Sequence, residues 1–505
     1  TSHPPELPLS QTALHTFPCP FGPRIRAYIS KEVEMRAHTQ MLLSAAALML
    51  ALPALAANPN APSPAQIAEA KALLGKSVAF NTAQGQRNTV AYANFLAEQF
   101  KAAGFAAEDI TVTPVDDTAN LTLRYRGKGG KRPMVVTGHM DVVAANPKDW
   151  TRDPFTMVEE NGYLFGRGVE DNKFDVSMAA ATLMRLKREG FVPDRDIYLM
   201  LSGDEETQGN TAPLQAKVAK AANAEFMLNS DGGGGELGED GKPIGYGVQG
   251  AEKAYADFEV TFTNPGGHSS APRPDNAINN AARAALAVAG YQFPVMSNEW
   301  TLGSFAAAGK TSPAPIGAAM LAFAANPDDA AAAAVIAADP MTVGQLRTTC
   351  VSTMVSGGHA PNALPQRAAL NINCRIFPGT PVEDVRKKIA ELVNTNRAAG
   401  APEATVKAVG GWVAGDASPL RPDVMGAVTT AVQARYPGIA VVPAMSSGAT
   451  DSVFYRALGI PSYGTAALFM KSSDGYAHGL NERVPTDAIP GALQQWHEVI
   501  TTLAK

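Results

Sequence analysis

Between residues 58 and 248, short apolar runs alternate with longer amphipathic stretches. The runs "PMVVTG", "DIYLMLSG" and "EFMLNS" have the composition of buried strands, and helical periodicity is found at about 175–189 and around "PLQAKVAKAA". Apolar strands joined by helices are typical of a parallel sheet that is covered on both faces. The pattern therefore predicts an α/β domain with a mostly parallel sheet for this part of the chain.

The pattern changes in the segment 249–410. The stretch "KAYADFEVTFT" alternates between apolar and polar positions, which predicts a strand with one covered face. The elements predicted after it are a helix at 276–290, strands at 345–356 and 367–377, a helix at 381–395 and the strand "ATVKAVG". The order β-α-β-β-α-β predicts a second domain, inserted into the first. Thr380 and Glu383 have the spacing of a capping box for the second helix.

The inserted domain is itself interrupted, and the first domain resumes after it. Residues 291–343 are expected to form Pro-bearing loops and one Ala-rich helix, "AAAAVIAA". From residue 411 to 505 the chain returns to a helix, a strand and a helix, which we expect to complete the first domain. The predicted fold is thus a two-domain α/β protein in which a mostly parallel sheet receives an inserted βαββαβ domain.

The first 57 residues do not fit this organisation. Residues 1–34 are rich in Pro and precede Met35, so we interpret them as an upstream extension. Residues 35–57 combine a short basic start, an apolar stretch and small residues near Ala56 and Ala57, where cleavage is expected. This is typical of a secretory signal peptide and too short for a stable membrane span, the alternative being a buried Ala/Leu helix. A secreted or periplasmic protein without membrane association after cleavage is predicted.

Composition narrows the classes of partner and ligand. The 505 residues carry a formal net charge of −5 and no basic stripe with interleaved aromatics, which argues against a nucleic-acid partner. Removal of the leader leaves Cys350 and Cys374 and no CxxC motif, so a metal would need His and carboxylate ligands. The two cysteines are equidistant from residue 362 on consecutive predicted strands. They would lie opposite each other, either as a disulfide or as two small buried residues.

Acidic and histidine side chains gather where the predicted strands end. Because the carboxyl ends of parallel strands meet at one edge of the sheet, ligands bind there. Three strand ends, a helix start and a segment near the C-terminus supply these candidates: His139 and Asp141, Glu205 and Glu206, Asp231, Asp171, and His478. Each alone is compatible with an ordinary loop pair, a solvated acidic loop or a helix N-terminus. Together, at the ends of neighbouring strands, these residues indicate a common site more specifically than any one of them does alone.

There is a chemical reason for such a set. Carboxylates packed together repel one another unless a cation lies between them. His, Asp and Glu without thiolates suit zinc, or a similar divalent ion, with positions left open for water. One carboxylate shared by two ions would give a two-metal hydrolytic centre.

Several segments resemble the signature blocks of the M20 family of metallopeptidases, the M20/M25/M40 branch: "GHMDVV", "GRGVEDNK", "GDEETQGN", "NSDGG", "NPGGHSSAP" and "HGLNERV". The resemblance extends over residues 65–500 and is greatest to carboxypeptidase S-like members. It implies two zinc ions per subunit, with Co²⁺ or Mn²⁺ as other divalent candidates. It also implies these ligands: His139 and Asp231 for one ion, Glu206 and His478 for the other, and Asp171 as the bridge. A cis peptide bond after Asp171 is implied as well.

Further roles follow from the same resemblance. Glu205 would be the general base, and Asp141 would accept a hydrogen bond from His139 and fix its tautomer. The inserted domain would act as a lid and dimerisation domain, in which His268 stabilises the oxyanion across a homodimer interface. Substrate contacts are implied for Asn362, Arg375 and Gly448. Arg375 would clamp a terminal carboxylate with two hydrogen bonds.

The function predicted from these features is zinc-dependent hydrolysis of amide bonds in short peptides that carry a free carboxylate. The alternative is an N-acyl-amino-acid amidohydrolase, which needs the same metals and the same carboxylate clamp but an apolar acyl pocket. A third hypothesis is a peptide-binding protein without turnover. Glu205 argues against the third, because a binding protein needs no base beside a metal.

Overall fold

The computed structural model of the protein describes residues 60–410 and 413–505. The upstream extension and the signal peptide predicted at 35–57 lie outside these residues. Among the helices described, none has both the length and the apolar character needed to cross a bilayer.

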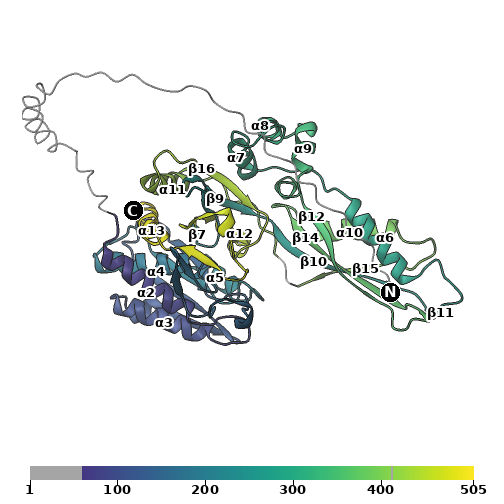
Figure 1. Ribbon diagram of the computed structural model, residues 1–505, viewed down its shortest axis with the longest axis horizontal. Helices are drawn as coiled ribbons and strands as arrows, with labels where there is room; N and C mark the ends of the chain where they lie inside the picture. The colour runs from purple at the N-terminus through teal and green to yellow at the C-terminus, as the bar shows by residue number, and fades with distance from the viewer. Residues whose placement is uncertain (1–59, 411–412) are drawn as a thin grey trace, which may run out of the picture. The chain divides into compact units, whose positions relative to one another are not determined.

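A sheet of ten strands, counted over the described residues, organises the first domain (Figure 1). The strand order is β1 (Ile110–Val115), β2 (Thr118–Tyr125), β6 (Ile197–Ser202), β3 (Met134–His139), β7 (Phe226–Asn229), β17 (Ser462–Gly464), β9 (Pro243–Glu252), β8 (Gly234–Leu237) and β18 (Phe469–Lys471), with β16 (Val441–Ser446) also paired to β9. The run β6-β3-β7-β17 is parallel, as predicted. Antiparallel strands flank it on both sides, and these were not predicted.

Helices cover both faces of this sheet. Alternate residues of β3 enter different hydrophobic clusters: Val136 packs with the large core, whereas Val135 packs with a smaller one. The large core includes residues of α2 (Pro64–Val78), α3 (Thr89–Ala102), α4 (Lys173–Arg188), α11 (Pro422–Arg435) and α13 (Ala488–Leu503). The smaller one includes residues of α5 (Thr211–Ala221) and α12 (Ser452–Ala457). The continuous apolar strands are explained by this two-sided burial.

The inserted segment forms a separate four-stranded antiparallel sheet with its own core. In chain order its elements are β10 (Ala254–Thr263), α6 (Ala277–Gly290), β12 (Thr349–Gly357), β14 (Arg367–Ile376), α10 (Val382–Thr395) and β15 (Thr405–Val409). Every second residue of β10 is buried, from Ala254 to Phe262. The predicted capping box is wrong: the N-cap residue of α10 is Pro381 rather than Thr380, and proline has no side-chain group that could accept a hydrogen bond. Glu383 instead accepts a hydrogen bond from Arg386 at 2.7 Å.

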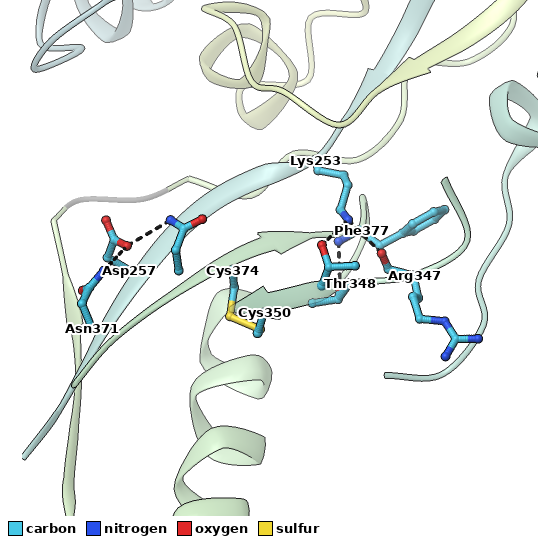
Figure 2. The surroundings of a disulfide bond; sticks show 10 residues. Lys253, Asp257, Arg347, Thr348, Cys350, Asn371, Cys374 and Phe377 are labelled. Carbon is cyan, nitrogen blue, oxygen red and sulfur yellow. Dashed lines mark hydrogen bonds between the residues drawn. A yellow bond between two sulfur atoms is a disulfide. The ribbon is translucent and has the colours of Figure 1, made fainter. Parts of the chain in front are cut away.

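A disulfide joins Cys350 to Cys374 in this sheet (Figure 2). The two residues are direct partners in the antiparallel register of β12 and β14. Of the two possibilities that the sequence left open, the structure has the disulfide. It closes a loop of 24 residues between consecutive strands.

The segment 291–343 is more helical than predicted. Its described residues form three helices, α7 (Glu299–Ala308), α8 (Ile316–Ala325) and α9 (Ala330–Ala337), where one was expected. Trp300 of α7 is buried against the first domain and donates to the carbonyl of Ser418 at 2.7 Å. A Cβ on Gly250 would lie 1.8 Å from the Trp300 ring, so only glycine fits there. Helix α7 therefore packs against β9 near the start of the inserted sheet.

Candidate metal centre and active site

Five of the predicted ligands form two groups with one shared member. His139, Asp171 and Asp231 make one group, and Asp171, Glu206 and His478 make the other, with ligand atoms within 4.8 Å of one another in each. Nε2 of His139 lies 2.8 Å from one oxygen of Asp171, and Nε2 of His478 lies 3.2 Å from the other oxygen. Each oxygen of Asp171 thus faces a different histidine, which is the arrangement a bridging ligand needs.

The fold brings these residues together from five segments of the chain. His139 ends β3, Glu206 follows β6 and Asp231 follows β7, so three ligands come from the carboxyl ends of neighbouring parallel strands. Asp171 precedes α4, and His478 lies in the loop before β19 (Arg483–Pro485) with a left-handed φ of 64°. The peptide bond between Asp171 and Asn172 is cis. This edge of the sheet is where α/β proteins bind their ligands.

The electrostatics of the site favour a cation. Burial raises the pKa of Asp231 well above its usual value and also raises that of Glu206. Burial opposes ionisation of Asp171 too, but hydrogen bonds from His139 and His478 leave its pKa lowered. Carboxylates that resist ionisation when packed together become stable anions once a divalent ion lies among them. Two imidazoles and three carboxylates without a thiolate fit zinc or a similar ion.

Both the backbone carbonyl and the carboxylate of Asp141 lie near the imidazole of His139. Nδ1 of His139 lies 3.1 Å from the backbone carbonyl of Asp141 and 3.6 Å from its carboxylate, so the carbonyl is the hydrogen-bond acceptor. The carboxylate of Asp141 accepts the amide hydrogens of Glu205 at 3.1 Å and of Glu206 at 3.0 Å. Asp141 therefore orients the loop that carries both glutamates, while its backbone orients the imidazole.

Glu205 lies beside the two groups of candidate ligands and belongs to neither of them. Burial raises its pKa well above the usual value, with His139 acting in the opposite direction. A carboxylate that is held close to a metal pair and is not itself a ligand is placed to act on a metal-activated water.

Glu482 was not singled out from the sequence, yet it organises the segment that carries Asp171. It is fully buried and forms an ion pair with Arg167 at 2.6 Å. Its two oxygens also accept the backbone amides of Gly168, Glu170 and Asp171 at 2.9, 2.8 and 3.0 Å. Its position in the block "HGLNERV", four residues after the predicted ligand His478, was the available signal.

The structure does not bring the other four predicted residues to the metal groups. Within the described residues, no hydrogen bond or ion pair connects His268, Asn362, Arg375 or Gly448 to the metal ligands. Nδ1 of His268 lies 2.8 Å from the hydroxyl of Ser270, and His268 pairs with Ala363, next to Asn362. The guanidinium of Arg375 lies 4.8 Å from the centre of the Tyr255 ring. The amide of Gly448 donates to the hydroxyl of Ser446 at 2.9 Å, so this donor is engaged.

A cavity of about 400 Å³ opens beside Asp171 and Asp231. The run of glycines 232–235 forms part of its lining, and Ala466, Leu468 and Met470 contribute apolar side chains. The cavity therefore adjoins both ligand groups, because Asp171 belongs to each of them and Asp231 to one.

Comparisons with known proteins agree with this site. The family model of peptidase family M20/M25/M40 matches residues 135–502. The chain is 27% identical over 408 residues to the N-fatty-acyl-amino acid synthase/hydrolase PM20D1.1 of Danio rerio, covering 74% of this chain and 71% of that protein. It is 25% identical over 389 residues to the probable carboxypeptidase S-like 2 of Dictyostelium discoideum, covering 72% and 71%.

A solved structure shares the fold. The M20 family metallo-carboxypeptidase Sso-CP2 from Sulfolobus solfataricus matches with a TM-score of 0.65 and 17% identity, over 86% of this chain and 98% of that one. Fold and site define an α/β enzyme of the metal-dependent peptidase and amidohydrolase class. The chain belongs to peptidase family M20/M25/M40.

Proposed function

We propose that the protein is a two-zinc hydrolase that cleaves amide bonds in short peptides with a free carboxylate. The observation that carries the proposal is the sharing of Asp171 between two ligand groups, with Glu205 beside them. When bound, the metal pair would polarise the scissile carbonyl and make a water more acidic. Glu205 takes a proton from the attacking water and delivers it to the leaving amine. Asp141 holds Glu205 in place through the backbone.

Hydrolysis of N-acyl amino acids is the second candidate function. It is favoured by the apolar side chains in the cavity beside Asp231 and by the likeness to a relative named as an N-fatty-acyl-amino acid synthase/hydrolase. Both substrate classes have an amide bond and a free carboxylate. They differ in the group on the acyl side, which is an amino acid in one and an apolar chain in the other.

Metal analysis combined with a substrate panel tests this proposal. We expect about two zinc ions per chain. We also expect the protein to hydrolyse dipeptides, N-acyl amino acids or both. This activity should stop when a chelator removes the metals and return when zinc is added. The substrate class with the higher kcat/KM decides between the peptide hydrolase and the N-acyl amino acid hydrolase. A protein that binds these compounds with its metals in place and hydrolyses none of them would be a peptide-binding protein, contrary to the proposal.

We also propose that the mature protein is secreted or periplasmic and forms a homodimer through the inserted sheet. The signal-peptide pattern of residues 35–57 supports the first part. The second part is supported by the edge strand β12, which exposes the apolar residues Val351, Met354 and Val355. In such a dimer His268 would reach the oxyanion of the partner's active site.

Mixing of inactive subunits tests whether His268 acts across the dimer. Dimers of His268→Ala and Glu205→Ala chains contain one site with both residues intact and one site with neither. Random pairing makes half of the dimers mixed, so activity should return to about a quarter of wild type. Subunit exchange must be demonstrated separately. Exchange without recovery of activity would mean that His268 does not act in trans.

A further inference from the structure

The cavity beside the predicted metal ligands has two kinds of lining. Its volume is about 400 Å³, and Ala466, Leu468 and Met470 give it apolar side chains. The charged residues that line it are Glu170, Asp171, Asp175, Asp231, Glu236 and Lys471. The apolar side chains alone suit an acyl chain, as in the second candidate function. A carboxylate next to them suits a group that also carries a positive charge, because a partly buried anion is stabilised by a cation beside it.

Most of the carboxylates in this lining already have a role. Asp171 and Asp231 are predicted metal ligands. Asp175 accepts the backbone amide of Ala467 at 2.8 Å and so holds the wall of the cavity in place. Of the acids that remain, Glu170 is the one that directly precedes a predicted ligand in the chain. Its carboxylate belongs to neither ligand group.

The carboxylate of Glu170 connects the segment of Asp171 with the segment that leads to His478. One of its oxygens accepts the backbone amide of Tyr476 at 3.0 Å, and the backbone of Ala477 adds a further hydrogen bond. Among the ion pairs of the residues that the structure describes, none includes Glu170. A carboxylate offers about four acceptor positions, so the two backbone amides leave room for an ammonium group.

The location of Glu170 suits an α-ammonium group of the substrate. In a peptide, the amino nitrogen and the carbonyl carbon of the first residue are bonded to the same Cα and lie about 2.5 Å apart. Glu170 and Asp171 are consecutive, with Cα atoms about 3.8 Å apart, and both line the cavity. A scissile carbonyl beside Asp171 therefore places this nitrogen within reach of Glu170. An N-acyl chain has a CH₂ group at the same position, which offers the carboxylate no partner.

We propose that the cavity receives the amino-terminal residue of a short peptide and that Glu170 binds its free α-ammonium group. The ammonium donates a charge-assisted hydrogen bond to the carboxylate. The apolar side chain of the same residue packs against Leu468 and Met470. The inference rests on the proposed function and refines it, because it favours peptides with a free amino terminus and an apolar first residue over N-acyl amino acids.

The test compares leucyl-leucine with N-acetyl-leucyl-leucine, in which the amino group is acetylated and uncharged. We expect the wild type to have the higher kcat/KM on the free amine. In Glu170→Gln the ratio of the two kcat/KM values should fall about ten- to a hundredfold, with unchanged metal content. The glutamine oxygen can still accept the amide of Tyr476, so the loop is preserved. If Glu170→Gln does not fold, the same ratio is measured in Glu170→Met, which has a side chain of similar length without charge.

Glu236→Gln is the matched control. Glu236 lines the same cavity, after the run of glycines 232–235, and its carboxylate accepts the hydroxyl of Ser472 at 3.1 Å. The substitution removes the same charge from the lining at a different place, so the ratio should stay as in the wild type. An equal fall in Glu236→Gln and Glu170→Gln would mean that the field of the cavity selects the free amine, and the contact with Glu170 would be refuted.

N-octanoyl-leucine and N-succinyl-leucine separate failure of the inference from failure of the proposed function. If the wild type prefers either of them to leucyl-leucine, the inference is overturned and amide hydrolysis stands. Lys471 in the lining is the group that would pair with the succinyl carboxylate. A preference for the free amine that survives in the Glu170 variants also overturns the inference. If none of the four compounds is hydrolysed while the metals are bound, the proposed function itself fails.

Discussion

Replacement of Glu205 by alanine is expected to lower kcat by about a hundred- to ten-thousandfold while the protein keeps both metals. Glu205 belongs to neither ligand group, so its loss removes the base and leaves every predicted ligand in place. Asp141 still binds the backbone amides at positions 205 and 206, which preserves the loop. Turnover on the best substrate of the panel and metal content per chain are the two measurements.

Glu206→Ala is the matched comparison, one residue further along the same loop. Oε1 of Glu206 lies 2.9 Å from Nε2 of His478 in the second ligand group. Its removal should therefore release metal from that group as well as abolish turnover. Both variants should therefore be inactive, but only Glu206→Ala should bind fewer metal ions per chain. An equal loss of metal in both would contradict the division of roles between base and ligand.

The parallel centre of the fold was predictable because its strands are buried on both faces and therefore continuously apolar. Two of the flanking strands, β1 and β8, were missed because they lack buried positions. Strand β1 has no buried position and contains a proline, Pro114, and β8 consists of Gly234, Gly235, Glu236 and Leu237, which lacks the composition of a strand. Helix α7 was missed because Trp300 packs against the first domain, a contact that local composition does not reveal. Helix α8 packs with α7 and α9 in a small cluster of its own, which is equally a matter of tertiary contacts.

The clustering of the His, Asp and Glu side chains could be predicted because the carboxyl ends of parallel strands meet at one edge of the sheet, whatever the conformation of the loops. The hydrogen bonds that Asp141 accepts from the amides of Glu205 and Glu206 could not be found in the same way, because they join residues 64 and 65 positions apart in the chain. Glu482 was missed because its ion pair with Arg167 joins residues 315 positions apart. Residues that act across a subunit interface, as implied for His268, are beyond what one chain displays.

Replacement of Glu482 by glutamine is expected to destabilise the protein by about 3–5 kcal/mol, because it leaves the buried Arg167 without a counter-ion. The amide group of glutamine would also direct a donor towards backbone amides that now donate to Glu482, among them that of Asp171. Since Asp171 serves both ligand groups, its displacement should weaken metal binding about ten- to a hundredfold. Chemical denaturation of the metal-free protein and zinc titration of the folded protein measure the two effects separately.

Glu225→Gln provides the control for a lost ion pair that is remote from the metals. Glu225 pairs with Arg195 and Arg421, both at 2.7 Å, just before β7 begins, at the opposite end of that strand from Asp231. It should lower stability without changing the zinc affinity of the folded protein. If Glu482→Gln behaves in the same way, with reduced stability and unaltered zinc affinity, then Glu482 only supports the fold. A selective loss of zinc affinity would identify it as the residue that holds the bridging aspartate in position.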